Sequence, residues 1–151
     1  PSTPAIGGET VATGPGATAI GWQSAATAER AQAFGHLATA QGERSLAVGE
    51  NADAQSDLST AIGNEAIANG TDALAIGDTA SATGPSTTSV GGESVTNGPG
   101  STAIGWQSAA TAERAQAFGH LATAQGVRST SNSASSSSSS FPVVGWKLVL
   151  L

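Results

Sequence analysis

Residues 45–49 read Ser-Leu-Ala-Val-Gly, and residues 73–77 repeat the pattern as Ala-Leu-Ala-Ile-Gly. Both stretches belong to a 14-residue period that runs through most of the chain. The final glycine recurs nine times without a change of spacing, and Ile, Val or Phe precedes it each time. Matches this regular predict a repeat protein in which each repeat is one turn of a solenoid. The repeated glycines are Gly7, Gly21, Gly35, Gly49, Gly63, Gly77, Gly91, Gly105 and Gly119.

The repeat is numbered here so that this glycine is the seventh residue of each coil. Positions three to six and ten to thirteen alternate between small and more variable residues, which is the period of a β-strand. Glycine at position seven, and Gly, Ala or Ser at position fourteen, predict two tight reversals of the chain. The sequence therefore predicts an all-β solenoid, a β-roll of nine 14-residue coils over residues 1–126. At the usual strand spacing of ~4.8 Å, these coils make a rod roughly 43 Å long.

The size of the side chains indicates which face of each strand points inward. Positions three, five, ten and twelve are almost all Ala, Ser or Thr, which fit between two closely spaced sheets. The residue at position six then points outward, and its repetition leaves an apolar stripe along the rod. Such a stripe marks an interface with another chain. The opposite assignment, with position six inside, needs no partner and remains open from sequence alone. The stripe consists of Ile6, Ile20, Phe34, Val48, Ile62, Ile76, Val90, Ile104 and Phe118.

The composition excludes several classes of function. The chain has 151 residues with a net charge of −6 and only five Lys or Arg, so no basic surface is available for nucleic acid. It has no cysteine, and no apolar run reaches the ~20 residues of a membrane-spanning helix, so we expect no direct membrane insertion. The two His and the scattered carboxylates form no nucleophile–base–orienter set. We therefore expect no enzymatic activity, no cofactor and no metal.

The pattern at residues 45–49 and 73–77 resembles the head repeats of the YadA-like trimeric autotransporter adhesins, and the resemblance covers residues 1–126. It implies a left-handed parallel β-roll and a homotrimer, with the position-six side chains buried between three chains. It also implies a bacterial cell-surface location, attached to the outer membrane in the full-length family. The head would then attach to a host matrix protein, a glycan or another cell surface. The sequence departs from the family in showing no heptad stalk, neck or anchor segment.

The same repeats also resemble segments of some phage tail fibres. A structural fibre subunit, either a phage tail fibre segment or a self-assembling extracellular filament, is therefore the alternative function.

A longer duplication lies over the 14-residue period. Residues 18–42 recur unchanged as residues 102–126, six coils further on, which predicts one surface patch displayed twice roughly 29 Å apart. Each copy has a Trp at position eight and a His at the same position of the next coil. Exposed Trp is common in binding hot spots, so this pair is a candidate ligand patch. Stacking that only caps the turns is the alternative. The four residues are Trp22, His36, Trp106 and His120.

The repeat pattern weakens after Gly126. Residues 127–140 are rich in serine and are predicted to be a linker. Residues 141–151 are apolar and long enough for one strand, with Val144, Trp146, Leu148 and Leu150 on one face. This strand either docks on an open sheet edge, in its own trimer or in the next molecule, or is a vector-derived or frameshifted tail.

Overall fold

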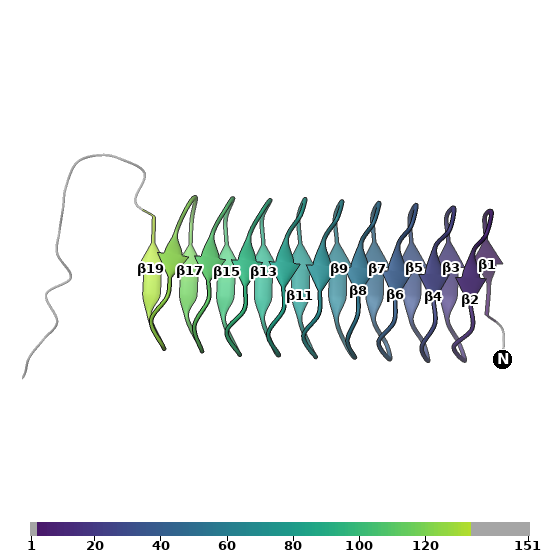
Figure 1. Cartoon of the computed structure of the whole chain (residues 1–151), viewed down its shortest axis with the longest axis horizontal. Coiled ribbons are helices and arrows are strands. Elements are labelled where there is room, and N and C mark those ends of the chain that lie inside the picture. The colour runs from purple at the N-terminus through teal and green to yellow at the C-terminus, as the bar shows by residue number, and fades with distance from the viewer. Residues whose placement is uncertain (1–2, 134–151) are drawn as a thin grey trace, which may run out of the picture.

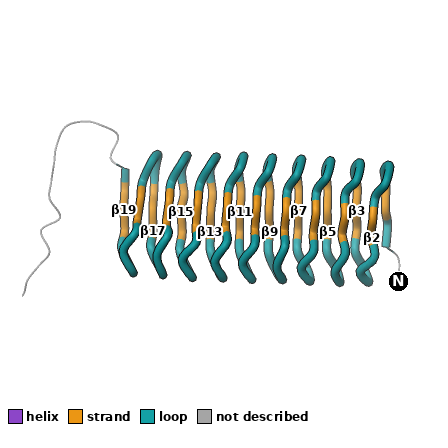
Figure 2. The backbone as a smooth tube through the Cα atoms, viewed as in Figure 1, coloured by secondary structure: helices purple, strands orange, loops and turns teal. Residues whose placement is uncertain are grey.

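A computed structural model describes residues 3–133, which form a solenoid of two parallel sheets (Figure 1). A typical coil has one strand of three residues and one of two residues. A tight turn follows each strand, as Figure 2 shows. The described residues contain no helix, and hence none that could span a membrane. These features confirm the predicted all-β solenoid. The predicted docking strand with Val144, Trp146, Leu148 and Leu150 lies outside the described residues.

The two sheets take alternate strands of the chain, and neighbouring strands in each sheet come from successive coils. The ten-stranded sheet contains β1 (Ala5–Ile6), β3 (Thr18–Ile20), β5 (Gln32–Phe34), β7 (Leu46–Val48), β9 (Thr60–Ile62), β11 (Leu74–Ile76), β13 (Thr88–Val90), β15 (Thr102–Ile104), β17 (Gln116–Phe118) and β19 (Thr130–Asn132). The nine-stranded sheet contains β2 (Val11–Ala12), β4 (Ala25–Ala26), β6 (Thr39–Ala40), β8 (Asp53–Ala54), β10 (Ile67–Ala68), β12 (Ser81–Ala82), β14 (Val95–Thr96), β16 (Ala109–Ala110) and β18 (Thr123–Ala124).

The strand register places every residue beside the residue 14 positions further along the chain. Val48, for example, pairs with Ile62 in the first sheet. The turns are joined in the same way, since the N–H of Glu65 donates to the carbonyl of Glu50 at 2.8 Å. Side chains of one coil position therefore form continuous columns along the rod.

The core between the two sheets is built from the small residues at positions three, five, ten and twelve. In one coil these residues are Ser59, Ala61, Ala66 and Ala68, and all four are fully buried. No residue larger than threonine is fully buried in the described part of the chain. The predicted inward face is thus confirmed, and the alternative with position six inside is wrong.

Several hydroxyl groups in this core are satisfied by the turns themselves. Thr87 Oγ1 donates to the carbonyl of Gly84 at 2.7 Å, and Ser94 Oγ donates to the carbonyl of Gly91 at 2.8 Å. Ser89 and Ser94 share a hydrogen bond of 2.8 Å between their hydroxyls across the core. Because these buried polar atoms have partners, serine and threonine replace alanine at these sites without a large desolvation cost. The buried hydroxyls of Ser24, Ser45 and Ser101 have no such partner.

Glycine at position seven is required for two independent reasons. Gly63 has a φ of +136°, which residues with a β-carbon rarely adopt. A Cβ on Gly63 would also overlap the carbonyl group of Gly77 in the next coil. The predicted reversal at position seven is therefore present, and any side chain there clashes with the backbone stacked on it.

Two further positions of each coil adopt a left-handed conformation that the sequence did not predict. Residues at positions two and nine have positive φ although most of them carry side chains, for example Leu58 at position two with +60° and Glu65 at position nine with +53°. Each is the third residue of a tight turn, the place where a type II turn requires positive φ. Their N–H groups donate to the neighbouring coil, as Leu58 does to the carbonyl of Glu43 at 2.9 Å. This bond helps to offset the strain of the conformation.

The stacked sheet continues past Gly126, to the end of β19 at residue 132. The N–H of Gln116 donates to the carbonyl of Ser129 at 2.8 Å, and Ser131 pairs with Ala117. The small residues Ser129 and Ser131 fit the inward positions three and five. The first residues of the segment 127–140, which the sequence assigns to a linker, therefore belong to the roll.

We predict that Gly63→Val lowers the free energy of unfolding by at least about 3 kcal/mol, because valine suits neither the φ angle nor the space. The matched control is Asn64→Val, one residue further along, which is exposed and lies outside the positive-φ positions. We expect that variant to cost less than about 1 kcal/mol. Thermal and urea unfolding followed by circular dichroism measure both, and equal stability of the two variants contradicts the stacking at Gly63.

Candidate ligand-binding surface

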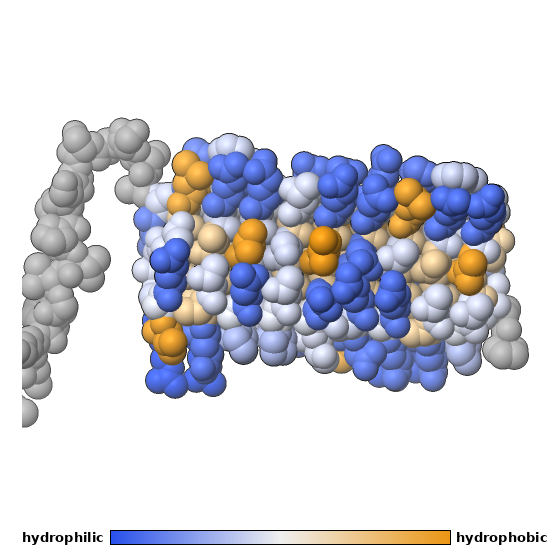
Figure 3. Space-filling view, viewed as in Figure 1, coloured by the Kyte–Doolittle hydropathy of each residue, from blue (hydrophilic) through white to orange (hydrophobic). Residues whose placement is uncertain are grey.

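The candidate site residues lie on the outside of the rod, along its sheets and turn edges. Polar side chains dominate the face seen in Figure 3, and apolar side chains are scattered among them. The position-six residues lie on the outer side of the first sheet. Ile6, Ile20 and Ile104 are exposed, whereas the remaining six are half-buried: Phe34, Val48, Ile62, Ile76, Val90 and Phe118.

The structure brings together each Trp and His of the duplicated patch. The ring centroids of Trp22 and His36 lie 5.0 Å apart with an interplanar angle of 20°. Trp106 and His120 repeat this arrangement at 4.9 Å and 22°. Both pairs immediately follow a position-seven glycine, so the 14-residue register stacks one ring on the other. Each indole nevertheless remains 49% exposed.

A glycine lies on the other side of each indole: Gly8 beside Trp22 and Gly92 beside Trp106. Neither glycine was among the site residues predicted from the sequence. A Cβ on Gly8 would lie 2.9 Å from Trp22 Cδ1, and one on Gly92 would lie 3.2 Å from Trp106 Cδ1. The edge of each five-membered ring therefore rests against glycine backbone, where a larger residue would displace it. The 14-residue spacing could have predicted this contact, because each glycine lies at position eight of the coil before its Trp.

A carboxylate and an amide complete each copy of the patch at position nine. Gln23 Nε2 donates to Glu9 Oε2 at 2.5 Å in the first copy, and Gln107 Nε2 donates to Glu93 Oε2 at 2.7 Å in the second. Each copy thus offers a half-exposed Trp, a carboxylate and an amide along one turn edge. Such a surface suits a ligand that combines a flat group with hydrogen-bond donors.

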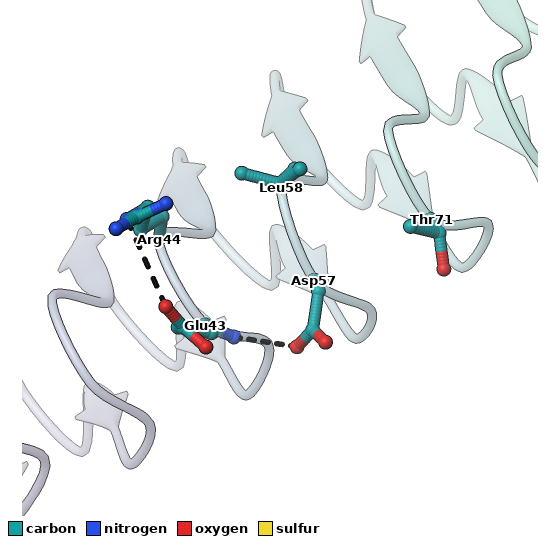
Figure 4. A pocket seen from close by; sticks show the side chains of 5 residues that line it. All are labelled: Glu43, Arg44, Asp57, Leu58 and Thr71. Atoms are coloured by element: carbon teal, nitrogen blue, oxygen red, sulfur yellow. Dashed lines mark hydrogen bonds and ion pairs between the residues drawn. The ribbon is translucent and has the colours of Figure 1, made fainter.

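The opposite turn edge, at positions one and two, carries a shallow pocket (Figure 4). Glu43, Arg44, Asp57, Leu58 and Thr71 line it. The Glu43 N–H donates to Asp57 Oδ1 at 2.8 Å, and Arg44 Nε lies 3.7 Å from Glu43 Oε1. Both side chains of this ion pair are about half exposed, so it contributes no more than about 1 kcal/mol. The pocket is a solvated turn edge without a reactive nucleophile.

Comparison with known families agrees with this geometry. The sequence profile of the YadA head domain repeat matches residues 5–24, 26–52, 54–80 and 82–108, which together make up more than half of the chain. The chain belongs to the YadA head family. No curated protein matches the chain. YadA heads are adhesin repeats without enzymatic activity in general, are homotrimeric in general, and belong to bacterial surface adhesins of the trimeric autotransporter kind.

For the Trp–His patch of this YadA head, we predict that Gly8→Ala moves Trp22 away from its present position. The added Cβ at 2.9 Å from Trp22 Cδ1 is closer than real contacts allow, so the indole has to shift. The fold should survive, because Gly8 is not among the positive-φ glycines. The indole N–H signal of Trp22 in an NMR spectrum should change, while that of Trp106 should not. An unchanged Trp22 signal contradicts the described packing.

Proposed function

We propose that this YadA head is the homotrimeric, surface-projecting part of a bacterial adhesin. Its role is attachment to a matrix protein, a glycan or another cell surface, without catalysis. The observation that carries the proposal is the row of Ile, Val and Phe on the outer side of the first sheet, in a chain of the YadA head family. A trimer that packs these rows together agrees with the general assembly of the family.

The position-six row supports the trimer on energetic grounds. Complete burial of an Ile, Val or Phe side chain contributes roughly 1.5–3 kcal/mol relative to full exposure. The row presents nine such residues per chain, and the half-buried ones still have part of this contribution to gain. Because the core between the sheets admits only small residues, the row cannot be buried there, and packing against two further chains is the arrangement that we propose. Trimerisation would bury this row along the full length of the rod.

The turn edge with the two Trp–His patches is the surface we propose for attachment. Three chains would display six patches, so weak individual contacts add up through multivalency. The net charge of −6 and the small number of basic residues favour protein or glycan partners over nucleic acid.

We predict that the double variant Ile62→Asp, Ile76→Asp dissociates the assembly, because each Asp places an unpaired charge in the proposed interface. The control is Thr27→Asp, Thr111→Asp, which adds the same charge at exposed positions directly after β4 and β16 of the other sheet. Light scattering coupled to size-exclusion chromatography measures the mass. We expect a trimer for the unmodified chain and for the control, and a monomer for the Ile variant. A folded monomer of the unmodified chain contradicts the proposal.

Attachment itself is tested with the fluorescently labelled protein on cultured cells and on wells coated with extracellular matrix. We predict saturable binding by the trimer and at least about a hundredfold weaker binding by the monomeric Ile62→Asp, Ile76→Asp variant, because avidity is lost. If the trimer binds neither cells nor matrix, the adhesin function is wrong.

A further inference from the structure

One three-residue motif has no part in the proposed trimer face or in the proposed attachment surface. Residues 69–71 read Asn-Gly-Thr, which matches the acceptor motif for N-glycosylation, Asn-x-Ser/Thr with any residue except proline in the middle. Among the asparagines of the chain, only Asn69 stands in such a motif. Asn97 is also followed by glycine, but Pro99 occupies the third place. The sequence therefore singles out one asparagine.

The stacking of the coils explains the glycine of this motif but not the other two residues. A Cβ on Gly70 would overlap the carbonyl oxygen of Gly84 in the next coil, so the packing of the roll requires this glycine. Asn69 stands at position thirteen, where most other coils have Thr or Gln, and it is not among the positive-φ residues. Thr71 stands at position one, which Pro, Glu, Asp or Val occupies in the other coils. The fold therefore requires neither Asn69 nor Thr71.

The side chains of Asn69 and Thr71 are both accessible. Asn69 follows β10 directly and is exposed, and the hydrogen bond that Ser56 Oγ donates to it at 2.7 Å reaches only its backbone carbonyl. At the same position of a later coil, the side-chain oxygen of Asn97 accepts from Thr83 Oγ1 at 2.9 Å. Thr71 is exposed as well and lines the shallow pocket of Figure 4. Both side chains that define the motif are thus open to solvent.

A sugar on Asn69 would leave the other proposed surfaces free. The strand β10 belongs to the second sheet, which lies across the small-residue core from the position-six row. The turn that follows Asn69 is the edge of positions one and two, opposite the edge with the Trp–His pairs. A bulky hydrophilic group at Asn69 would therefore project into solvent, away from the proposed trimer face and from the attachment surface.

We propose that Asn69 is an N-glycosylation site of this YadA head. In the transfer, Nδ2 of Asn69 forms a bond to C1 of a sugar that is carried on a nucleotide diphosphate or a lipid diphosphate. The bond between C1 and the diphosphate oxygen breaks, the diphosphate leaves, and one amide proton passes to a base of the transferase. No group is oxidised or reduced. The transfer takes place before the coils stack, since Gly70 is buried once the roll has formed.

The test is mass spectrometry of the full chain isolated from the bacterium that produces it. We expect the intact mass to exceed the mass of the sequence by one or more sugar residues, and fragment ions to place the sugar on Asn69. Asn69→Gln should lose this added mass completely. The fold of that variant should survive, because Gln41 and Gln55 stand at the same position. The matched control Asn97→Gln changes an asparagine that also precedes glycine, and it should keep the sugar.

Variants of Thr71 separate glycosylation from any other modification of the asparagine. Thr71→Ala leaves Asn69 in place but removes the hydroxyl that the motif requires, so the sugar should be lost. Thr71→Ser restores a hydroxyl and should keep the sugar. Thermal unfolding followed by circular dichroism checks that each variant folds like the unmodified chain.

Three results would overturn the proposal: no sugar on Asn69 in the chain from the producing bacterium, a sugar that persists in Thr71→Ala, or a sugar carried by serine or threonine hydroxyls instead. The proposal is independent of the attachment function. The mass measurement decides on the modification of Asn69 whether or not the trimer binds cells.

Discussion

The close approach of the two sheets is the constraint on which the rest of this structure depends. The tight turns hold the sheets so near to each other that only Ala, Ser and Thr fit completely between them, as Ala61 and Thr87 illustrate. Such a core provides little apolar surface per residue. The coils are held together mainly by hydrogen bonds from each strand and turn to the next. The larger apolar residues, such as Ile62, are consequently placed on the outside.

The outward position of the large apolar residues connects the fold to its proposed assembly and function. A solenoid whose large aliphatic residues point outward has an apolar face in contact with water along its entire length. Packing three such faces together produces a rod that needs no thick core in any single chain. The turn edges then remain available, and the strict 14-residue register stacks their side chains into columns. Surface features can therefore arise from changes of single residues within one column, such as Trp106, which stacks on His120.

Much of the fold could be predicted from the sequence, because the period is short and the inward positions tolerate so few residue types. The position-seven glycines, the inward alanines and the neighbouring Trp22 and His36 all follow from counting in steps of 14. The positive φ angles at positions two and nine are indicated by the sequence where glycine follows proline, at Gly16 and Gly100. They could not be predicted where residues such as Arg44 and Leu58 stand, since these residues do not favour them. Hydrogen bonds to the neighbouring coil, rather than local preference, hold that conformation.

Two other features depended on three-dimensional context. The continuation of the roll through β19 is hidden by the loss of the glycine, which Ser133 replaces. No described coil stacks on Ser133, so a side chain is tolerated there. The part played by Gly8 and Gly92 beside the indoles became visible only from the packing of each Trp. The trimer and the attachment partner are not properties of a single chain, and they remain proposals.

Amide hydrogen exchange measured by NMR tests the central claim, the stacking of coils in a 14-residue register, most directly. From the second coil to the ninth, the N–H groups of positions seven and nine donate to the preceding coil, as Gly63 does to Val48 and Glu65 to Glu50, both at 2.8 Å. The N–H of position eight makes no backbone hydrogen bond in the described coils. The account predicts slow exchange at positions seven and nine and fast exchange at position eight, repeated every 14 residues. Protection with another period, or equal protection at all three positions, contradicts it.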